Sequence, residues 1–379
     1  MGGPGYLRTA GFSISLLVQY AVAEYKTTDD SHCDCYLTNG STGAYFTTHK
    51  FYDFRSMSDH VNVPSSLVSD ADAASQADPA NDYFTSQAWT EAWSIQQWNN
   101  SASVDDGDAE LLMANSPANI YIETNTDANA QSDTYLSLRT VRLDDFQTAA
   151  EFESTSEAYH FVSARMYART VGASGAITAM FTYRGSDDPN AIQEADLEVR
   201  TMDPPDVIQY TNQPSFSATG DAVDSATRNA TVPVGWDDWA VHRMDWSPDS
   251  TMWYVDGVDV SQISFQTPRD PSYIIFNTWS DGAHWSGNMS VGDEAYLQIQ
   301  WIELVFNSTG GDGTSADGGT HRRSLSKRED NCQNVCSVDE TDTVGTPVLL
   351  QGGASGASPG RLGVFCIPAL VIAAMYLLS

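Results

Sequence analysis

Three carboxylates in one short segment are the residues best suited to carry chemistry. Glu194, Asp196 and Glu198 alternate with apolar residues at 195, 197 and 199. Successive side chains of a β-strand point to opposite faces, so a strand here would put all three carboxylates on one face and the apolar residues in the core. Neighbouring carboxylates repel one another, which costs stability unless the arrangement serves a function.

The spacing of the two glutamates suits cleavage of a glycosidic bond. Four strand residues separate the Cα atoms of Glu194 and Glu198 by about 13 Å. Each side chain reaches about 4 Å, so on a concave sheet the carboxyl groups can approach to about 5 Å, the separation in a retaining glycosidase. Two other interpretations are a solvated acidic outer strand and a Ca²⁺ site, because stacked carboxylates can bind that ion.

The sequence around this segment predicts strands. Period-2 alternation or short apolar runs occur at 161–169, 176–183, 250–258, 273–279 and 295–306. Asp256-Gly257 is a hairpin turn signal. Many strands without intervening helices predict an all-β fold, a sandwich of two antiparallel sheets. Helix and strand are hard to separate only at 86–98. We expect Trp246, Trp253 and Trp301 in the core.

The segments that flank the carboxylates resemble glycoside hydrolase family 16. This family includes laminarinases, lichenases, xyloglucan transglycosylases and fungal wall transglycosylases, and its signature is E-x-D-x-E on a strand, as at 194–198. Further matches follow the order and spacing of the family over roughly 110–306: they are 151–154, 163–166, 175–182, 210–212, 239–246, 253–257, 277–279 and 285–287.

The resemblance implies a concanavalin A-like β-jelly-roll sandwich with a substrate cleft across its concave face. Glu194 would be the nucleophile, which forms a covalent glycosyl-enzyme, and Glu198 would be the acid/base. Asp196 would hydrogen-bond Glu194 and help to keep Glu198 protonated by like-charge repulsion. The chemistry needs no cofactor. A structural Ca²⁺ occurs in parts of the family, but no local loop marks one in this sequence.

Sugar-binding residues also follow from the resemblance. Trp279 and Trp285 would stack on the flat apolar faces of β-linked glucose, although each could equally be a core tryptophan. Polar residues expected near the cleft are Asn212, His242 and Asn277. For His242, a hydrogen-bonded core histidine is the competing interpretation.

Three departures from the family concern the substrate rather than the catalytic residues. Gln193 stands where the family usually has Asp, no Arg is evident near Glu153, and the 33–35 segment is unlike the cysteine-rich start of chitin–glucan transglycosylases. We therefore expect a glycosidase of β-glucan, an endo-β-1,3- or β-1,3(4)-glucanase. Alternatives are a wall transglycosylase with the same glycosyl-enzyme and a non-catalytic lectin-like protein, against which the presence of both Glu194 and Glu198 counts.

Composition restricts the partners. The 379-residue chain has 18 Lys and Arg against 50 Asp and Glu, a net charge of −32. This argues against nucleic acid and against an anionic membrane surface as partners, since both require a basic patch. Hydrophobic residues make up 41% of the chain and aromatic ones 11%, enough for a large core. We expect a monomer.

Both ends of the chain resemble processing signals. Residues 1–23 combine Arg8, a short apolar stretch and an A-x-A-like site, which predicts a signal peptide; the alternative is the frayed start of a cytosolic protein. Residues 362–379 form an uncharged apolar tail after small polar residues, which predicts a GPI-attachment signal over 354–379; the alternative is a transmembrane tail. The expected location is the cell surface or wall, with a lipid anchor in the outer membrane leaflet.

The region between these signals divides into a catalytic domain over 24–306 and a flexible linker over 307–353. Lys327-Arg328 is a dibasic processing site or simply part of an exposed linker. Outside the tail, which contains Cys366, two cysteine pairs at 33/35 and 332/336 predict two disulfides of undetermined pairing, or else a zinc site. Sequons that suit a secreted glycoprotein begin at Asn39, Asn99, Asn229, Asn288 and Asn307.

Overall fold

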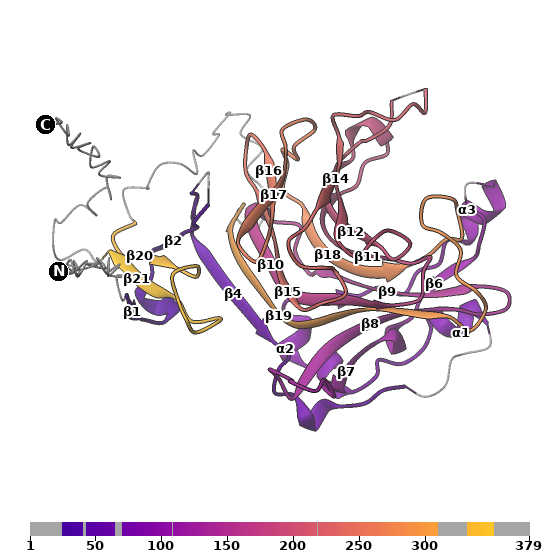
Figure 1. The fold of residues 1–379 in the computed structure, drawn as a ribbon, viewed down its shortest axis with the longest axis horizontal. Coiled ribbons are helices and arrows are strands. Elements are labelled where there is room, and N and C mark those ends of the chain that lie inside the picture. The colour runs from indigo at the N-terminus through magenta and orange to yellow at the C-terminus, as the bar shows by residue number, and fades with distance from the viewer. Residues whose placement is uncertain are drawn as a thin grey trace, which may run out of the picture.

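The structure is a computed structural model that describes residues 25–40, 43–64, 70–107, 109–217, 219–309 and 332–351. The predicted terminal signals at 1–23 and 354–379, and Lys327-Arg328, lie outside these ranges. Two antiparallel layers face each other and are continuous through β8 and β9 (Figure 1). The all-β sandwich predicted from the strand pattern is therefore confirmed. No helix within the described ranges is long and apolar enough to cross a membrane.

The first layer carries the three carboxylates. Its strand order is β14 (Thr227–Thr231), β13 (Val207–Gln213), β12 (Gln193–Arg200), β11 (Ile177–Arg184), β18 (Tyr273–Trp279) and β9 (Gln147–Ser154), with β5 (Trp93–Ile95) beside β9. We call this layer the cleft sheet.

The second layer, the back sheet, covers the other side of the core. Its strand order is β17 (Val258–Ile263), β16 (Thr251–Val255), β15 (Ala240–Trp246), β10 (Tyr159–Gly172), β19 (Glu294–Ser308) and β8 (Thr134–Arg142). Strand β4 (Thr48–Asp53) pairs with β19, β7 (Ile120–Thr124) pairs with β8, and β6 (Met113–Asn115) runs parallel to β9.

Short helices connect the strands. They are α1 (Ala71–Ser75), α2 (Gln87–Thr90) and α3 (Ser101–Asp106), with 3₁₀ turns at Asp30–His32, Ser58–His60, Asp82–Thr85, Pro117–Asn119 and Pro189–Ala191. The ambiguous segment 86–98 contains both α2 and β5, which explains its mixed pattern.

The core between the sheets follows the two-residue period of the strands. On β12, Leu197 and its neighbours at 195 and 199 are buried in it, and Trp246 and Trp253 enter it from the back sheet with no exposed surface. The prediction for these two tryptophans is confirmed. Trp301 is also buried, at 5% exposed, as predicted. It lies outside the largest core cluster and stacks on Tyr167 with ring centroids 5.9 Å apart.

The two ends of the described chain form a separate five-stranded sheet. Its order is β1 (Lys26–Thr27), β21 (Val348–Gln351), β20 (Val335–Ser337), β2 (Cys35–Leu37) and β3 (Tyr45–Phe46). Figure 1 shows it at one end of the molecule, and we call it the terminal module. Residues 332–351 are thus folded, and their assignment to a flexible linker was wrong.

Two disulfides hold the terminal module together. Cys33 is bonded to Cys336, and Cys35 to Cys332, across sequence separations of 303 and 297 residues. The zinc interpretation of these cysteines is therefore wrong. Cross-links over such long loops remove much of the freedom of the unfolded chain, which explains why a polar segment after a Gly- and Ser-rich stretch folds against the N-terminal strands.

Buried charges join the terminal module to the back sheet. Asp339 accepts a hydrogen bond from Arg165 at 2.5 Å and lies 3.4 Å from Arg243, and all three side chains are at most 6% exposed. Burial alone would raise the pKa of Asp339, but the two guanidinium groups outweigh it and lower that pKa. Gly345 rests on the ring of Phe51 in β4, where a Cβ atom would collide with the ring.

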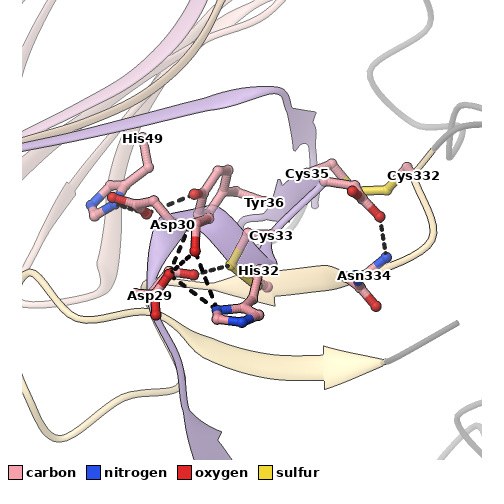
Figure 2. Close-up of a disulfide and its surroundings, with 12 residues drawn as sticks. Asp29, Asp30, His32, Cys33, Cys35, Tyr36, His49, Cys332 and Asn334 are labelled. Carbon is pink, nitrogen blue, oxygen red and sulfur yellow. Dashed lines mark hydrogen bonds and ion pairs between the residues drawn. A yellow bond between two sulfur atoms is a disulfide. The ribbon is translucent and has the colours of Figure 1, made fainter.

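His49 on β4 forms a second link. Its Nδ1 lies 2.8 Å from an Asp30 carboxylate oxygen (Figure 2). Its Nε2 lies 3.1 Å from Glu303. Burial alone would lower the pKa of His49, but its two carboxylate partners raise it to about 9. The folded pKa exceeds the unfolded value of about 6.5, so this contribution to stability is complete below pH ~6.5 and disappears as the pH rises through about 9.

Replacing Asp339 by Ala should destabilise the protein by about 3–5 kcal/mol, because two buried guanidinium groups would lose their shared partner. Urea unfolding of Asp339→Ala and wild type, both with intact disulfides, measures the difference. Asp342→Ala is the matched control, since Asp342 is an exposed carboxylate of the same segment. Equal unfolding midpoints for both variants would show that the charge cluster does not hold the module in place.

Candidate active site

One face of the cleft sheet carries a row of paired residues across five strands, and four of the five are polar. Glu198 on β12 pairs with Ala179 on β11 and with Gln209 on β13. Ala179 pairs in turn with Asn277 on β18, and Asn277 with Glu151 on β9. Neighbouring strands lie about 4.8 Å apart, so a linear ligand along this row would cross the strands and pass over Glu198.

The three carboxylates lie together on this face, as predicted. Glu194, Asp196 and Glu198 line a cavity of about 250 Å³, and the two glutamates also line an adjoining open groove of about 630 Å³. Asp196 is 1% exposed, hydrogen-bonds Glu194, and accepts a hydrogen bond from Gln213 Nε2 at 3.4 Å. A solvated outer strand is therefore the wrong interpretation of this segment.

Desolvation at the floor of the cleft gives these carboxylates unusual proton affinities. It raises the pKa of Glu194 to about 7, against the opposing effect of the hydrogen bond with Asp196. It raises the pKa of Glu198 to about 8, with repulsion from the Glu194 charge as the next contribution. The amide of Gln209, 3.5 Å from Glu198 Oε2, acts in the opposite direction because it stabilises the charged form.

The middle carboxylate adds to this effect. Burial, and then the charges of Glu194 and Glu198, raise the pKa of Asp196 well above its usual value. Three carboxylates this close cannot all be ionised near neutral pH, so the site retains at least one proton beside a carboxylate. A proton donor next to an ionised nucleophile is the pairing that acid-assisted displacement at a sugar carbon requires.

The predicted aromatic platforms lie at the cleft. Trp279 lines both the cavity and the groove, and Trp285 lines the groove. Their ring centroids are 6.0 Å apart with planes 28° from parallel, and the Arg200 guanidinium lies 5.6 Å from the ring centre of Trp285. Asn277 also lines the cavity, where its Nδ2 donates to Glu151 at 3.2 Å.

Two predicted binding residues lie elsewhere. His242 is 2% exposed and lies in the core, because it occupies the same face of β15 as Ala240, Met244 and Trp246. Burial lowers the pKa of His242 to about 4. Asn212 has no exposed surface and donates to the carbonyl of Phe265 at 3.0 Å. Asn212 points to the opposite face of β13 from Gln209, Thr211 and Gln213, which line the groove, and His242 belongs to the back sheet, so these two predictions were wrong.

Sequence reasoning missed several residues of the cleft. Glu151 accepts hydrogen bonds from Trp98 and Asn277, and burial raises its pKa. The alternation of side chains along a strand could have identified two of them. Glu151 lies in a segment that matches the family, and Gln209 is on the same strand as the expected Asn212 but points to the opposite face. The missed lining residues are Trp98, Met113, Asn115, Glu151, Ala179, Phe181, Gln209, Thr211, Gln213, Ser215, Phe216, Ala222, Val223, Asp224 and Thr227.

The departure at Gln193 has a structural explanation. Gln193 is on the core-facing side of β12 and is 9% exposed. Its side-chain amide donates to Asp270, and its Oε1 accepts from the backbone N–H groups of Arg269 and Asp270. This residue therefore attaches the start of β12 to the loop before β18 and does not face the cleft.

The carboxylates of this site are not arranged to bind a metal ion. Within the described ranges, no group of three or more His, Cys, Asp and Glu side chains has an arrangement that could hold a metal ion. The Ca²⁺ interpretation of 194–198 accordingly has no support from the geometry.

The chain matches known proteins over the same region. The family model for glycosyl hydrolases family 16 matches residues 113–303, which contain the whole carboxylate segment. A xylanase/beta-glucanase of Ruminococcus flavefaciens is 23% identical over 231 residues, 60% of this chain and 25% of that protein. A beta-glucanase of Bacillus subtilis is 26% identical over 138 residues, 35% of this chain and 52% of that enzyme.

A solved structure shows a similar fold. It is a prokaryotic β-1,3-1,4-glucanase (lichenase) from a mouse hindgut metagenome, 15% identical, with a TM-score of 0.45 over 68% of this chain and 99% of that one. The alignments with the two sequence relatives span a quarter and about half of their own lengths.

Replacing Glu198 by Gln should raise the melting temperature at pH 8 but much less at pH 5. The folded pKa of about 8 exceeds the unfolded value of about 4.3, so the native carboxyl destabilises the fold increasingly between these pH values, and a neutral amide does not. An effect of several degrees is expected, since about 1 kcal/mol shifts Tm by roughly 2–4 °C in a domain of this size. Thermal unfolding followed by circular dichroism measures the shift.

Glu340→Gln is the control for this experiment, because Glu340 is exposed on the terminal module. A Glu198→Gln variant that is less stable than wild type at pH 8 would contradict the electrostatic account of the site.

Proposed function

This chain belongs to glycosyl hydrolases family 16, and we propose on that basis that it is a retaining endo-β-glucanase that cleaves β-1,3- or β-1,3(4)-linked glucan. The observation that carries the proposal is the position of Glu194 and Glu198 on one face of β12, at the floor of a cleft, with raised pKa values and Asp196 between them. The names of the sequence relatives, a xylanase/beta-glucanase and beta-glucanases, agree with this substrate class.

The first half of the reaction forms a glycosyl-enzyme. Ionised Glu194 attacks the anomeric carbon, while protonated Glu198 gives its proton to the leaving oxygen. Desolvation helps both groups, because it raises the nucleophilicity of Glu194 and keeps the proton on Glu198. The hydrogen bond between Asp196 and Glu194 holds the nucleophile in place.

The second half regenerates the enzyme. Glu198, now a carboxylate, removes a proton from an incoming hydroxyl group, whose oxygen attacks the anomeric carbon and displaces Glu194. Water as the attacking group gives hydrolysis, and a sugar hydroxyl gives transglycosylation, which is the alternative function. A lectin-like role has less support, because sugar binding alone does not require three mutually repelling carboxylates on one strand.

Glucan binding in this proposal uses both sides of the carboxylates. Trp279 supplies an aromatic face above the cavity. Asn277 and Glu151, already joined to each other, present hydrogen-bonding groups to sugar hydroxyls on the β9 side. Gln209 and Gln213 occupy the opposite side on β13.

The location of the protein is part of the same proposal. We infer that it is a monomeric, fungal-type glycoprotein that passes through the secretory pathway and remains at the cell surface or wall on a GPI anchor. Two disulfides support an oxidising compartment. The sequons Asn229 and Asn288 have exposed side chains, whereas Asn307 is 7% exposed and accepts a hydrogen bond from the backbone N–H of Thr47.

Endo-β-glucanase activity is tested by incubating the protein with laminarin and with lichenan and analysing the oligosaccharides released. Glu198→Gln should reduce the rate by about 10²–10⁴-fold, as expected for loss of a general acid, and Glu194→Gln should remove turnover. Azide should partly restore the reaction of Glu194→Ala by forming an α-glycosyl azide. Glu340→Gln is the control, and wild-type rates in either active-site amide variant would overturn the assignment of the two glutamates.

Gln209→Leu should move the alkaline limb of the kcat/KM profile to higher pH. Its amide stabilises the ionised form of Glu198, so its removal raises the pKa of that acid, and the enzyme keeps its catalytic proton to a higher pH. Kinetics on lichenan between pH 5 and 10 measure the limb, with Gln262→Leu, a change of an exposed residue of β17, as the control. A shift to lower pH would contradict this role.

The secretion proposal predicts glycans on Asn229 and Asn288 and none on Asn307 in protein made by a eukaryotic host. Enzymatic deglycosylation in ¹⁸O water followed by peptide mass spectrometry identifies the occupied sites. Phosphatidylinositol-specific phospholipase C should release the protein from membranes. A native protein with a glycan on Asn307, or one retained with peptide 362–379 still attached, would count against the proposal.

A further inference from the structure

We propose that the open groove beside β13 and β14 binds a second glucan chain as acceptor, with Phe216 as its stacking platform. The enzyme would then transfer glycosyl groups to a sugar hydroxyl as well as to water. This inference rests on the proposed function and assigns a substrate to one end of the same cleft.

The two ends of the cleft differ in size and in the side chains that border them. The cavity of about 250 Å³ on the β9 side presents Glu151, Asn277 and Trp98, which hydrogen-bond one another and offer polar atoms at fixed positions. The groove of about 630 Å³ on the β13 side is larger, and it is bordered by Trp285 and Phe216. The smaller cavity suits recognition of one bound sugar, whereas the larger groove with its aromatic borders has room for several sugars of a second chain.

Phe216 is unusually exposed for its type. Its exposed fraction is 60%, the largest of any Phe, Tyr or Trp side chain in the described ranges. An aromatic ring left in water forgoes the free energy of burial. At the border of a groove that contains the candidate nucleophile and acid, the flat face of a sugar ring is the apolar surface that would cover it.

The loop that carries Phe216 holds the ring in a defined position. The backbone of Phe216 forms a β-bridge with Ala222, and Val223 donates to the carbonyl of Ser215 at 2.8 Å. Ser215 donates in turn from its N–H to Gln213 Oε1 at 2.8 Å. Because the same Gln213 side chain donates to Asp196, the loop is joined directly to the catalytic carboxylates.

The position of the groove suits an acceptor. Gln209 and Thr211 line the floor of the groove, and their register partners on β12 are Glu198 and Asp196. A sugar hydroxyl that enters from this side would reach Glu198, the base of the second half-reaction. The hydroxyl proton moves to Glu198, the new bond joins its oxygen to the anomeric carbon, and the bond to Glu194 breaks to release the carboxylate.

The experiment compares transfer with hydrolysis in the full enzyme. A lichenan-derived oligosaccharide serves as donor and a fluorescently labelled laminari-oligosaccharide as acceptor, and each product is quantified by chromatography. Phe216→Ala should lower the ratio of transfer to hydrolysis by about 2- to 10-fold and raise the apparent KM for the acceptor, because stacking contributes about 0.5–1.5 kcal/mol. Phe216→Trp should retain the wild-type ratio.

Phe265→Ala is the matched control, since Phe265 is 40% exposed on a loop and does not line the groove. Its ratio should equal that of wild type. The inference is overturned if Phe216→Ala lowers transfer and hydrolysis equally, which would make the groove a donor site, or if wild type forms no transfer product. Failure of the proposed function is a different result, namely no cleavage of any β-glucan by wild type.

Discussion

The two-residue period of β12 is the constraint on which the rest of the site depends. It directs Glu194, Asp196 and Glu198 to the cleft and the residues between them to the core, so the same strand holds the sheets together and carries the candidate catalytic carboxylates. Three carboxylates on one face repel one another and lose hydration, which opposes folding. The large apolar core beneath them provides the stability that this arrangement requires. Function and stability are therefore in direct opposition on one strand.

The back sheet also buries charged side chains, but there each is paired with a group of opposite charge. Arg165 and Arg243 are buried there with Asp339 of the terminal module, while His49 is held between Asp30 and Glu303. Every one of these charges has an opposite partner, whereas the cleft glutamates have almost none. Proton affinities diverge as a result: the pKa of Asp339 is lowered and those of Glu194 and Glu198 are raised. Carboxylates are thus ion-paired on one sheet and lack opposite charges beside them in the cleft of the other.

Sequence patterns predicted the elements well where side-chain alternation dominates. The strands at 161–169 and 273–279 and the carboxylate face of β12 follow directly from period-2 alternation. The roles of single residues were harder to infer. They depend on which face of its strand a side chain is on, and a match to a motif does not give that face. His242 and Asn212 both lie in matched segments yet face the core. The terminal module was missed for another reason: its fold depends on two long-range disulfides and on buried ion pairs with the back sheet, and no local pattern in 332–351 records either.

A covalent bond between Glu194 and the sugar is the step on which the proposed reaction depends. A 2-deoxy-2-fluoro-glucanosyl reagent with a good leaving group slows both half-reactions but especially the second, so the glycosyl-enzyme accumulates and can be digested and sequenced by mass spectrometry. We expect one adduct, on the side chain of Glu194, formed at the rate at which activity is lost. An adduct on Glu198 or Glu151, or full turnover of β-glucan by an enzyme that never carries an adduct, would contradict it.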